Sequence, residues 1–245
     1  MCPPLQSFVT LSAELLRHIS ARMLGIAKIA LLSLLIATAA AEGFSQVSLS
    51  PSGSLANTAL IQEWRALLGS GAEMAESAKV RRVNDFFNQR IQFEEDSEVW
   101  GQSDYWATPL ETLVQKRGDC EDFAIAKYFT LLELGVPVSR LRLVYVKVSQ
   151  DGMAGATSRA HMVLAYYPHQ GSTPMVLDNL SADVVPASAR HDLIPVFSFN
   201  TEGLWIGTGN QTSTSSYSRW QELVARTQSE GFLKNRTAHV QRAGL

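Results

Sequence analysis

The 245-residue chain has few cysteines and no excess of charge of either sign. It contains two cysteines, and its 21 basic and 23 acidic residues give a formal net charge of -2. Such a balance, with the two signs well mixed, gives no reason to propose electrostatic binding of nucleic acid. The 46% hydrophobic content is still enough to bury one core, so the composition predicts a single globular domain.

Several motifs that would identify an enzyme class are also missing. The chain has no G-x-S-x-G, H-E-x-x-H, G-x-x-x-x-G-K-[ST] or C-x-x-C sequence. Serine hydrolases, zincins, P-loop proteins and thioredoxin-type oxidoreductases therefore have no support. A zinc site built on Cys120 would need more cysteine or histidine ligands than the sequence offers.

Long apolar runs are absent too, since the run IALLSLLIATAAA is shorter than the roughly 20 residues of a membrane span. Basic residues precede it and small residues end it, which is typical of a secretory signal peptide. We expect a signal peptide over residues 1–41, cleaved before Glu42, and export of the mature chain. An uncleaved anchor is the alternative, and Met23 is a second candidate for the true start.

The exported chain would keep a single cysteine, because Cys2 lies in the segment predicted to be removed. A lone cysteine cannot form an intramolecular disulfide, although exported proteins usually pair their thiols. Cys120 is therefore either an inert buried residue or a functional one.

Apolar periodicity predicts an α+β domain over residues 58–245, preceded by a flexible Ser-rich lead-in over residues 42–57. The helix that begins after Asp119 is expected to be largely buried, with a thin polar stripe of Lys127, Thr130 and Glu133. Helices are predicted at 58–68, 72–90, 109–114, 119–134 and 218–228, and strands of an antiparallel sheet at 141–148, 160–167, 174–180, 193–200 and 203–207.

The stretch QKRGDCEDFAIAKYF places Cys120 at a helix start. Asp119 is a good N-cap, so Cys120 falls on the first helical position. Asp122 stands where a carboxylate can accept a hydrogen bond from the backbone N–H of the cap residue. The positive end of the helix dipole favours a thiolate there. Acids in a first helical turn are also ordinary, so the pattern alone leaves the role of Cys120 open.

A nucleophilic cysteine needs a base and an acceptor that orients the base. His161 begins one predicted strand, and Asp178 lies in the next. If the intervening hairpin turns near Gln170, Asp178 lies opposite His161 or one diagonal step away. The alternatives are that His161 is a satisfied core histidine and that Asp178 merely ends a strand.

The segments DYWATPLETL, GDCEDFAIAKYFTLLELGVP, AHMVLAYY and LDNL together resemble the bacterial transglutaminase-like cysteine proteinases, and closely the LapG type. The resemblance spans about residues 75–205. It implies a papain-like, transglutaminase-like core whose Cys-His-Asp triad is carried onto Cys120, His161 and Asp178.

The resemblance also implies a function. LapG-type proteins are periplasmic proteases that cleave the N-terminal region of a large surface adhesin at a di-alanine site and so release biofilm. An inner-membrane receptor that responds to cyclic di-GMP holds them inactive. A transamidase with the same triad, or a binding module without catalysis, remain the alternatives.

Calcium bound beside the cysteine is a further implication of the resemblance, carried onto Asp119 and Glu121, with Asp104 as a third candidate. Acids so close to Cys120 would disfavour its thiolate, and a bound dication would cancel that effect. Calcium takes about 6 to 8 oxygen ligands, so backbone carbonyls or waters would have to complete the shell.

Overall fold

The computed structural model describes residues 51–149, 158–206, 211–213 and 218–232. The predicted signal peptide and residues 42–50 lie outside the described residues. Within the described part, no helix is both long enough and apolar enough to cross a membrane.

The lead-in prediction is wrong from Pro51 onward, because helix α1 (Pro51–Gly71) begins there. Proline is favoured at the first helical position, where its missing N–H has no intrahelical partner. Extending a helix that already exists requires no new nucleation, so the serines of this stretch do not stop it.

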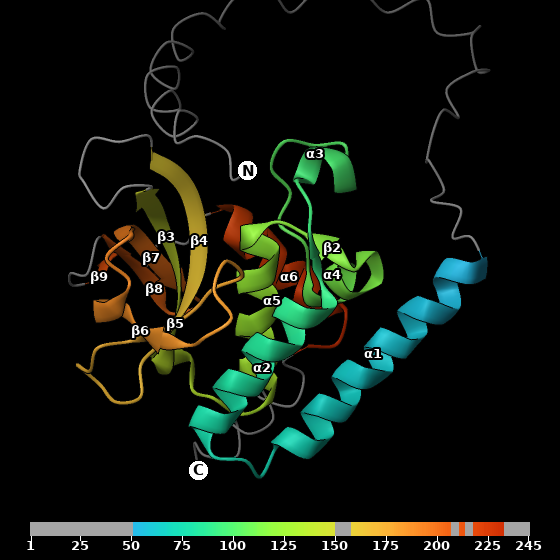
Figure 1. Cartoon of the computed structure of the whole chain (residues 1–245), viewed down its shortest axis with the longest axis horizontal. Helices are drawn as coiled ribbons and strands as arrows, with labels where there is room; N and C mark the ends of the chain where they lie inside the picture. The colour runs from blue at the N-terminus through green and yellow to red at the C-terminus, as the bar shows by residue number, and fades with distance from the viewer. Residues whose placement is uncertain (1–50, 150–157, 207–210, 214–217, 233–245) are drawn as a thin grey trace, which may run out of the picture.

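A seven-stranded antiparallel sheet forms one layer of the domain, in the order β6-β5-β4-β3-β7-β8-β9 (Figure 1). All five predicted strands are present. The edge strands β6 and β9 were not predicted, because two or three residues carry no readable alternation. The strands are β3 (Leu141–Ser149), β4 (Ser158–Tyr166), β5 (Met175–Leu177), β6 (Val185–Pro186), β7 (Leu193–Asn200), β8 (Gly203–Ile206) and β9 (Gln211–Ser213).

The helices lie beside the sheet, and the longest buried one, α5, runs between β4 and α2 (Figure 1). This arrangement confirms the α+β prediction. After α1 the helices are α2 (Glu76–Arg90), α3 (Asp96–Val99), α4 (Pro109–Gln115), α5 (Cys120–Glu133) and α6 (Ser218–Ser229), with short 3-10 turns η2 (Val138–Arg140) and η3 (Ala187–Ala189).

Helix α5 is buried on every side, including Lys127 and Thr130 of its predicted polar stripe, while Glu133 at its end is half-buried. Thr130 Oγ1 accepts a hydrogen bond from Trp64 Nε1 of α1 at 3.0 Å, and Lys127 Nζ donates to Asn84 Oδ1 of α2 at 2.9 Å. Buried polar groups need such partners. The stripe therefore joins α5 to the two N-terminal helices rather than to solvent. The helix ends before Gly135, whose φ of +84° suits glycine.

A short parallel pair connects the end of α2 with the start of α5. It is formed by β1 (Gln92–Phe93) and β2 (Arg117–Gly118). The Gln92 N–H donates to the Lys116 carbonyl at 2.9 Å, and the Glu94 N–H donates to the Gly118 carbonyl at 3.0 Å. These bonds place the acidic residues after α2 next to the N-terminus of α5.

Burial lowers the pKa of Lys127 to about 7 against its ordinary 10.5, although Asp178 and Asp85 raise it. Between these two pKa values the unfolded chain binds a proton that the folded protein does not bind. The free energy of unfolding should therefore rise with pH in this window, by at most about 1.4 kcal/mol for each pH unit. We expect Lys127→Met to remove this rise in urea-unfolding experiments.

The control for this experiment is Lys147→Met, which removes a lysine that is exposed on β3. The rise should persist in the control. An unchanged rise in Lys127→Met would show that the buried ammonium does not have this effect.

Candidate active site

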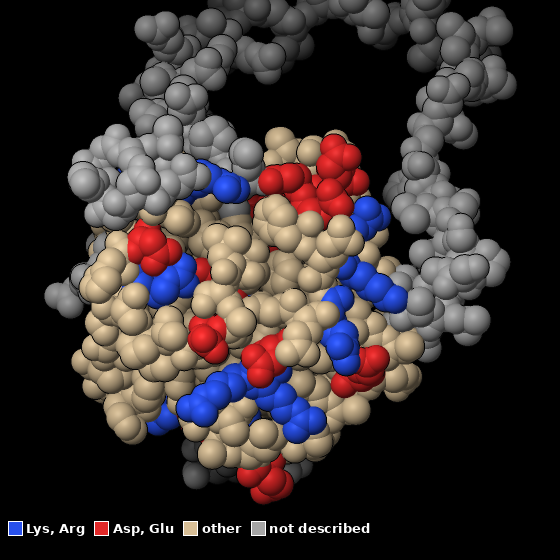
Figure 2. Space-filling view, in the orientation of Figure 1, with Lys and Arg blue, Asp and Glu red and all other residues tan. Residues whose placement is uncertain are grey.

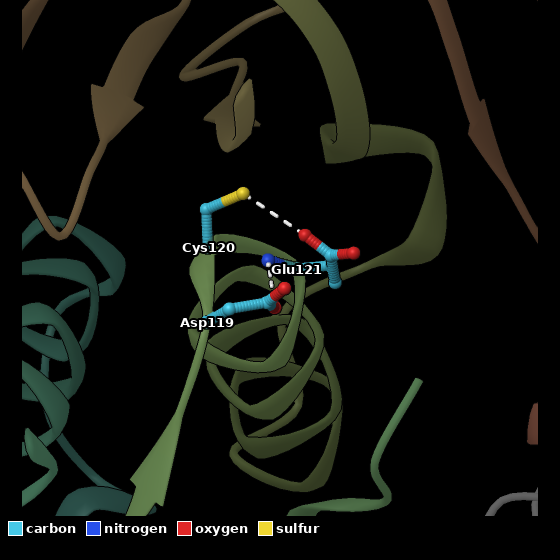
Figure 3. Close-up of side chains that lie close together, drawn as sticks. All are labelled: Asp119, Cys120 and Glu121. Atoms are coloured by element: carbon cyan, nitrogen blue, oxygen red, sulfur yellow. Dashed lines mark hydrogen bonds between the residues drawn. The ribbon is translucent and has the colours of Figure 1, made fainter. Parts of the chain in front are cut away.

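Cys120 is the first residue of α5, as predicted, and 1% of its surface is exposed. The Asp119 carboxylate caps the helix by accepting the Glu121 N–H at 3.2 Å (Figure 3). Cys120 Sγ lies 2.9 Å from Glu121 Oε2, to which it is hydrogen-bonded. The sulfur therefore sits among carboxylates at the positive end of the helix dipole.

Asp122 has a role that the sequence did not reveal. Its Oδ1 accepts the Ala107 N–H at 2.8 Å, which ties the loop before α4 to the first turn of α5. A Cβ added to Gly118 would stand 2.6 Å from Asp122 Oδ2. Only glycine leaves room for this carboxylate beside the backbone.

The predicted contact between His161 and Asp178 is confirmed. Strands β4 and β5 pair Leu164 with Leu177, which puts Asp178 one diagonal step from His161. Their Nε2 and Oδ1 atoms are 2.7 Å apart, and the Leu180 N–H also donates to Oδ1, at 3.0 Å.

Asp178 is ionised in this setting. Burial alone would raise its pKa, but the hydrogen bond and charge of His161, the Leu180 N–H and Arg190 together lower the pKa to about 2. A charged carboxylate accepts hydrogen bonds only, so His161 Nε2 is the donor. The other ring nitrogen, Nδ1, is then left to accept or give a proton.

Helix α5, which begins with Cys120, packs against β4, the strand that carries His161. No hydrogen bond joins Sγ to the imidazole among the residues that the structure describes, and the sulfur instead has the bond to Glu121. That the imidazole activates Cys120 stays a prediction from the sequence.

Carboxylates from three segments gather at the first turn of α5. Oxygen atoms of Asp96, Asp119 and Asp122 lie within 4.8 Å of one another, as do those of Asp96, Asp104 and Glu121. The structure thus brings together all three residues predicted as calcium ligands, and it adds Asp96. The acidic run EEDSE at residues 94–98 was the only signal for it in the sequence.

These carboxylates are destabilised in their charged form. Burial first, and then the charge of Asp104, raises the pKa of Asp96 to about 6. Burial and Asp96 raise that of Asp119 to about 7. For Glu121 and Asp122, burial and the charge of Asp119 raise the pKa well above the ordinary range.

Buried oxygens without hydrogen-bond partners among the described residues are also present, namely Asp96 Oδ1, Asp104 Oδ1 and Asp122 Oδ2. Buried polar atoms are seldom left unpaired. Several oxygen donors with excess negative charge form the donor set of a hard divalent cation such as calcium or magnesium. The residues present therefore fit a cation.

The C-terminal helix α6 holds the loop that carries Asp104. Arg219 forms an ion pair with Asp104, and Arg226 donates to Tyr105 Oη at 2.6 Å and to the Trp106 carbonyl. Trp106 packs on Phe199 with a ring separation of 5.6 Å. In the space-filling view, acidic surface gathers around α3, above this loop (Figure 2).

Comparison with known proteins identifies the family. A model of the bacterial transglutaminase-like cysteine proteinases matches residues 68–212. The chain belongs to this family. None of the curated proteins matches the chain.

Solved structures of LapG from Legionella pneumophila share the fold. The calcium-bound form is 40% identical with a TM-score of 0.62, and the match covers 70% of this chain and 91% of that chain. The EGTA-treated form is 38% identical with a TM-score of 0.62, covering 71% and 95%. The domain is thus a transglutaminase-like α+β fold of the LapG type, as the sequence predicted.

The raised pKa values predict a pH dependence for the ion-free protein. Between about pH 4 and 7 the folded protein binds protons on Asp96 and Asp119 that the unfolded chain has released, since their pKa values are about 6 and 7 against 3.8. The free energy of unfolding should therefore fall as pH rises through this window. We expect Asp96→Asn, melted in chelator, to show a smaller fall.

The matched control is Glu98→Gln, which removes an exposed carboxylate from the same short helix. Its melting temperature should follow that of the unchanged protein. If Asp96→Asn shows the full fall with pH, the repulsion among the buried acids is not its cause.

Proposed function

We propose that the protein is a calcium-dependent cysteine endopeptidase in which Cys120 is the nucleophile, His161 the general base and acid, and Asp178 the residue that orients the imidazole. The observation that carries this proposal is the buried carboxylate cluster around Cys120 at the start of α5, together with a His161 imidazole, on the adjoining strand β4, that is bonded to an ionised aspartate.

The chemistry follows from the positions of these groups. His161 Nδ1 accepts the proton of the Cys120 thiol, and the sulfur then attacks the carbonyl carbon of a peptide bond. The imidazolium protonates the leaving amine as the C–N bond breaks, which leaves a thioester on Cys120. Water deprotonated by His161 hydrolyses the thioester and restores the thiol. The Cys120 backbone N–H, at the helix N-terminus, is available to the oxyanion.

The residues that would hold calcium are Asp96, Asp104, Asp119 and Glu121, all with carboxylate oxygens in the cluster. Bound calcium would supply positive charge that offsets the acids around the thiolate. The two LapG structures in calcium-bound and EGTA-treated forms support this choice of ion.

The substrate that we propose is the N-terminal region of a large cell-surface adhesin, cut at a di-alanine site, so that the adhesin is released and the biofilm disperses. We also propose that the protein acts in the periplasm after removal of residues 1–41, and that an inner-membrane cyclic di-GMP receptor inhibits it. The support for these points is the LapG-type similarity and the signal-like N-terminus of the sequence.

The proposal predicts that the purified protein cleaves a fragment of such an adhesin in calcium and not in chelator, as followed by gel electrophoresis and mass spectrometry of the products. Cys120→Ala should reduce cleavage to background because it lacks the nucleophile. Asp178→Asn should lower kcat by roughly 10²- to 10⁴-fold, since the amide cannot hold the same tautomer of His161.

Glu98→Gln, which removes an exposed carboxylate from α3, is the control substitution and should cleave normally. Added primary amine separates hydrolysis from transamidation, because a transamidase would attach the amine to the product. Equal cleavage in calcium and chelator would refute the dependence on calcium, and equal cleavage by Cys120→Ala would refute the mechanism.

A further inference from the structure

The two carboxylate oxygens of Asp178 have different partners. Oδ1 accepts His161 Nε2 and the Leu180 N–H, at 2.7 and 3.0 Å. Oδ2 lies 2.8 Å from Arg190 Nη1, in an ion pair whose geometry departs from a straight hydrogen bond. The Asp178 side chain is fully buried, so solvent does not supply a substitute for either partner.

Arg190 is itself held firmly. Its Nε and Nη2 atoms bond to the two carboxylate oxygens of Asp192, at 2.9 and 2.7 Å. The Asp192 carbonyl accepts the Ser149 N–H of β3 at 2.8 Å, which fixes this segment to the sheet. A planar guanidinium that donates two hydrogen bonds from one edge to a carboxylate has little rotational freedom. Its remaining Nη1 group is thus presented to Asp178 at a set position.

The backbone around Asp178 is fixed by other residues. Asn88 of α2 donates to the Asp178 and Ser181 carbonyls, at 2.8 and 3.1 Å, and Asn84 donates to the Ala182 carbonyl at 3.0 Å. These bonds set where the residue lies but leave its side-chain torsions undetermined. The terminal torsion of an aspartate is broad, so contacts of its own oxygens have to select the rotation that points Oδ1 at His161, and these contacts are the Leu180 N–H on Oδ1 and Arg190 on Oδ2.

We propose that Arg190 is a positioning residue that orients the Asp178 carboxylate toward His161 by anchoring its second oxygen to Asp192. The inference rests on the proposed function, in which this carboxylate orients the imidazole. Among the described residues, the Arg190 side chain pairs with Asp178 and Asp192, so the contribution that we propose for it acts through Asp178.

The charged groups that face this pair come from two sides. Arg190 and Asp192 belong to the segment between η3 and β7, and Lys127 acts on Asp178 from α5. The Lys127 ammonium bonds to Asn84 rather than to Asp178. Among the described lysines and arginines, Arg190 is therefore the one that forms an ion pair with the Asp178 carboxylate.

The test is Arg190→Met, which keeps much of the side-chain length and removes the guanidinium. We expect kcat to fall about 10²-fold with KM nearly unchanged, because a misoriented base affects the chemical step rather than the binding of substrate. The low-field proton resonance of His161 Nε2–H, observed by NMR in the ion-loaded protein, should weaken or disappear as the bond to Asp178 is lost.

Arg190→Lys keeps the positive charge but lacks the planar guanidinium with its several donors. Asp192→Asn weakens the paired hydrogen bonds that hold the guanidinium. Both should give losses smaller than that of Arg190→Met, and they remain informative if Arg190→Met does not fold. The matched control is Arg90→Met, which breaks an exposed ion pair with Glu63 and should leave both readouts unchanged.

Wild-type kcat and an intact His161 resonance in Arg190→Met, or in both milder variants where Arg190→Met does not fold, would overturn the inference. A lower melting temperature without loss of the resonance would also overturn it, since it would show a merely structural role. The resonance requires no substrate. An unchanged protein that fails to cleave any adhesin would therefore refute the proposed function while the role of Arg190 is still decided by NMR.

Discussion

Mutual repulsion among five buried or half-buried carboxylates at the first turn of α5 is the constraint on which this end of the molecule depends. The chain offsets part of it with fixed partial charges, because the start of α5 and the Ala107 N–H both face the acids. Arg219 offsets another part from α6. The repulsion that is not offset raises the pKa values of the clustered acids, and several of their oxygens have no hydrogen-bond partner among the described residues. A bound cation would remove this repulsion.

The sequence was sufficient where a short-range pattern determined the geometry. An N-cap followed by an apolar helix set Cys120 at the first position of α5. The alternation of the two strands, with a turn between them, set the diagonal approach of His161 and Asp178. In both cases the relevant residues are related by one element or one hairpin, whose periodicity is visible in the chain.

The sequence did not predict contacts made by segments that lack the apolar periodicity of a helix or a strand. Asp96 reaches the cluster through the parallel pair β1–β2, which has two residues in each strand. Arg190 follows a single turn of 3-10 helix, and nothing in its neighbours along the chain points to Asp178. The polar stripe of α5 was visible, but its partners on α1 and α2 depend on how the helices pack, which one-dimensional periodicity does not determine.

The contacts of α6 with the loop before α4 have a consequence for the order in which the parts of the proposed active site form. Arg226 and Tyr105 are separated by 121 residues, so the loop that carries Asp104 is fixed only after the last described helix has been made. A nascent chain that has already formed the sheet contains its sulfur and its imidazole, yet it lacks a settled ion-binding loop. The cutting ability proposed for the protein would thus appear only once α6 has packed against this loop.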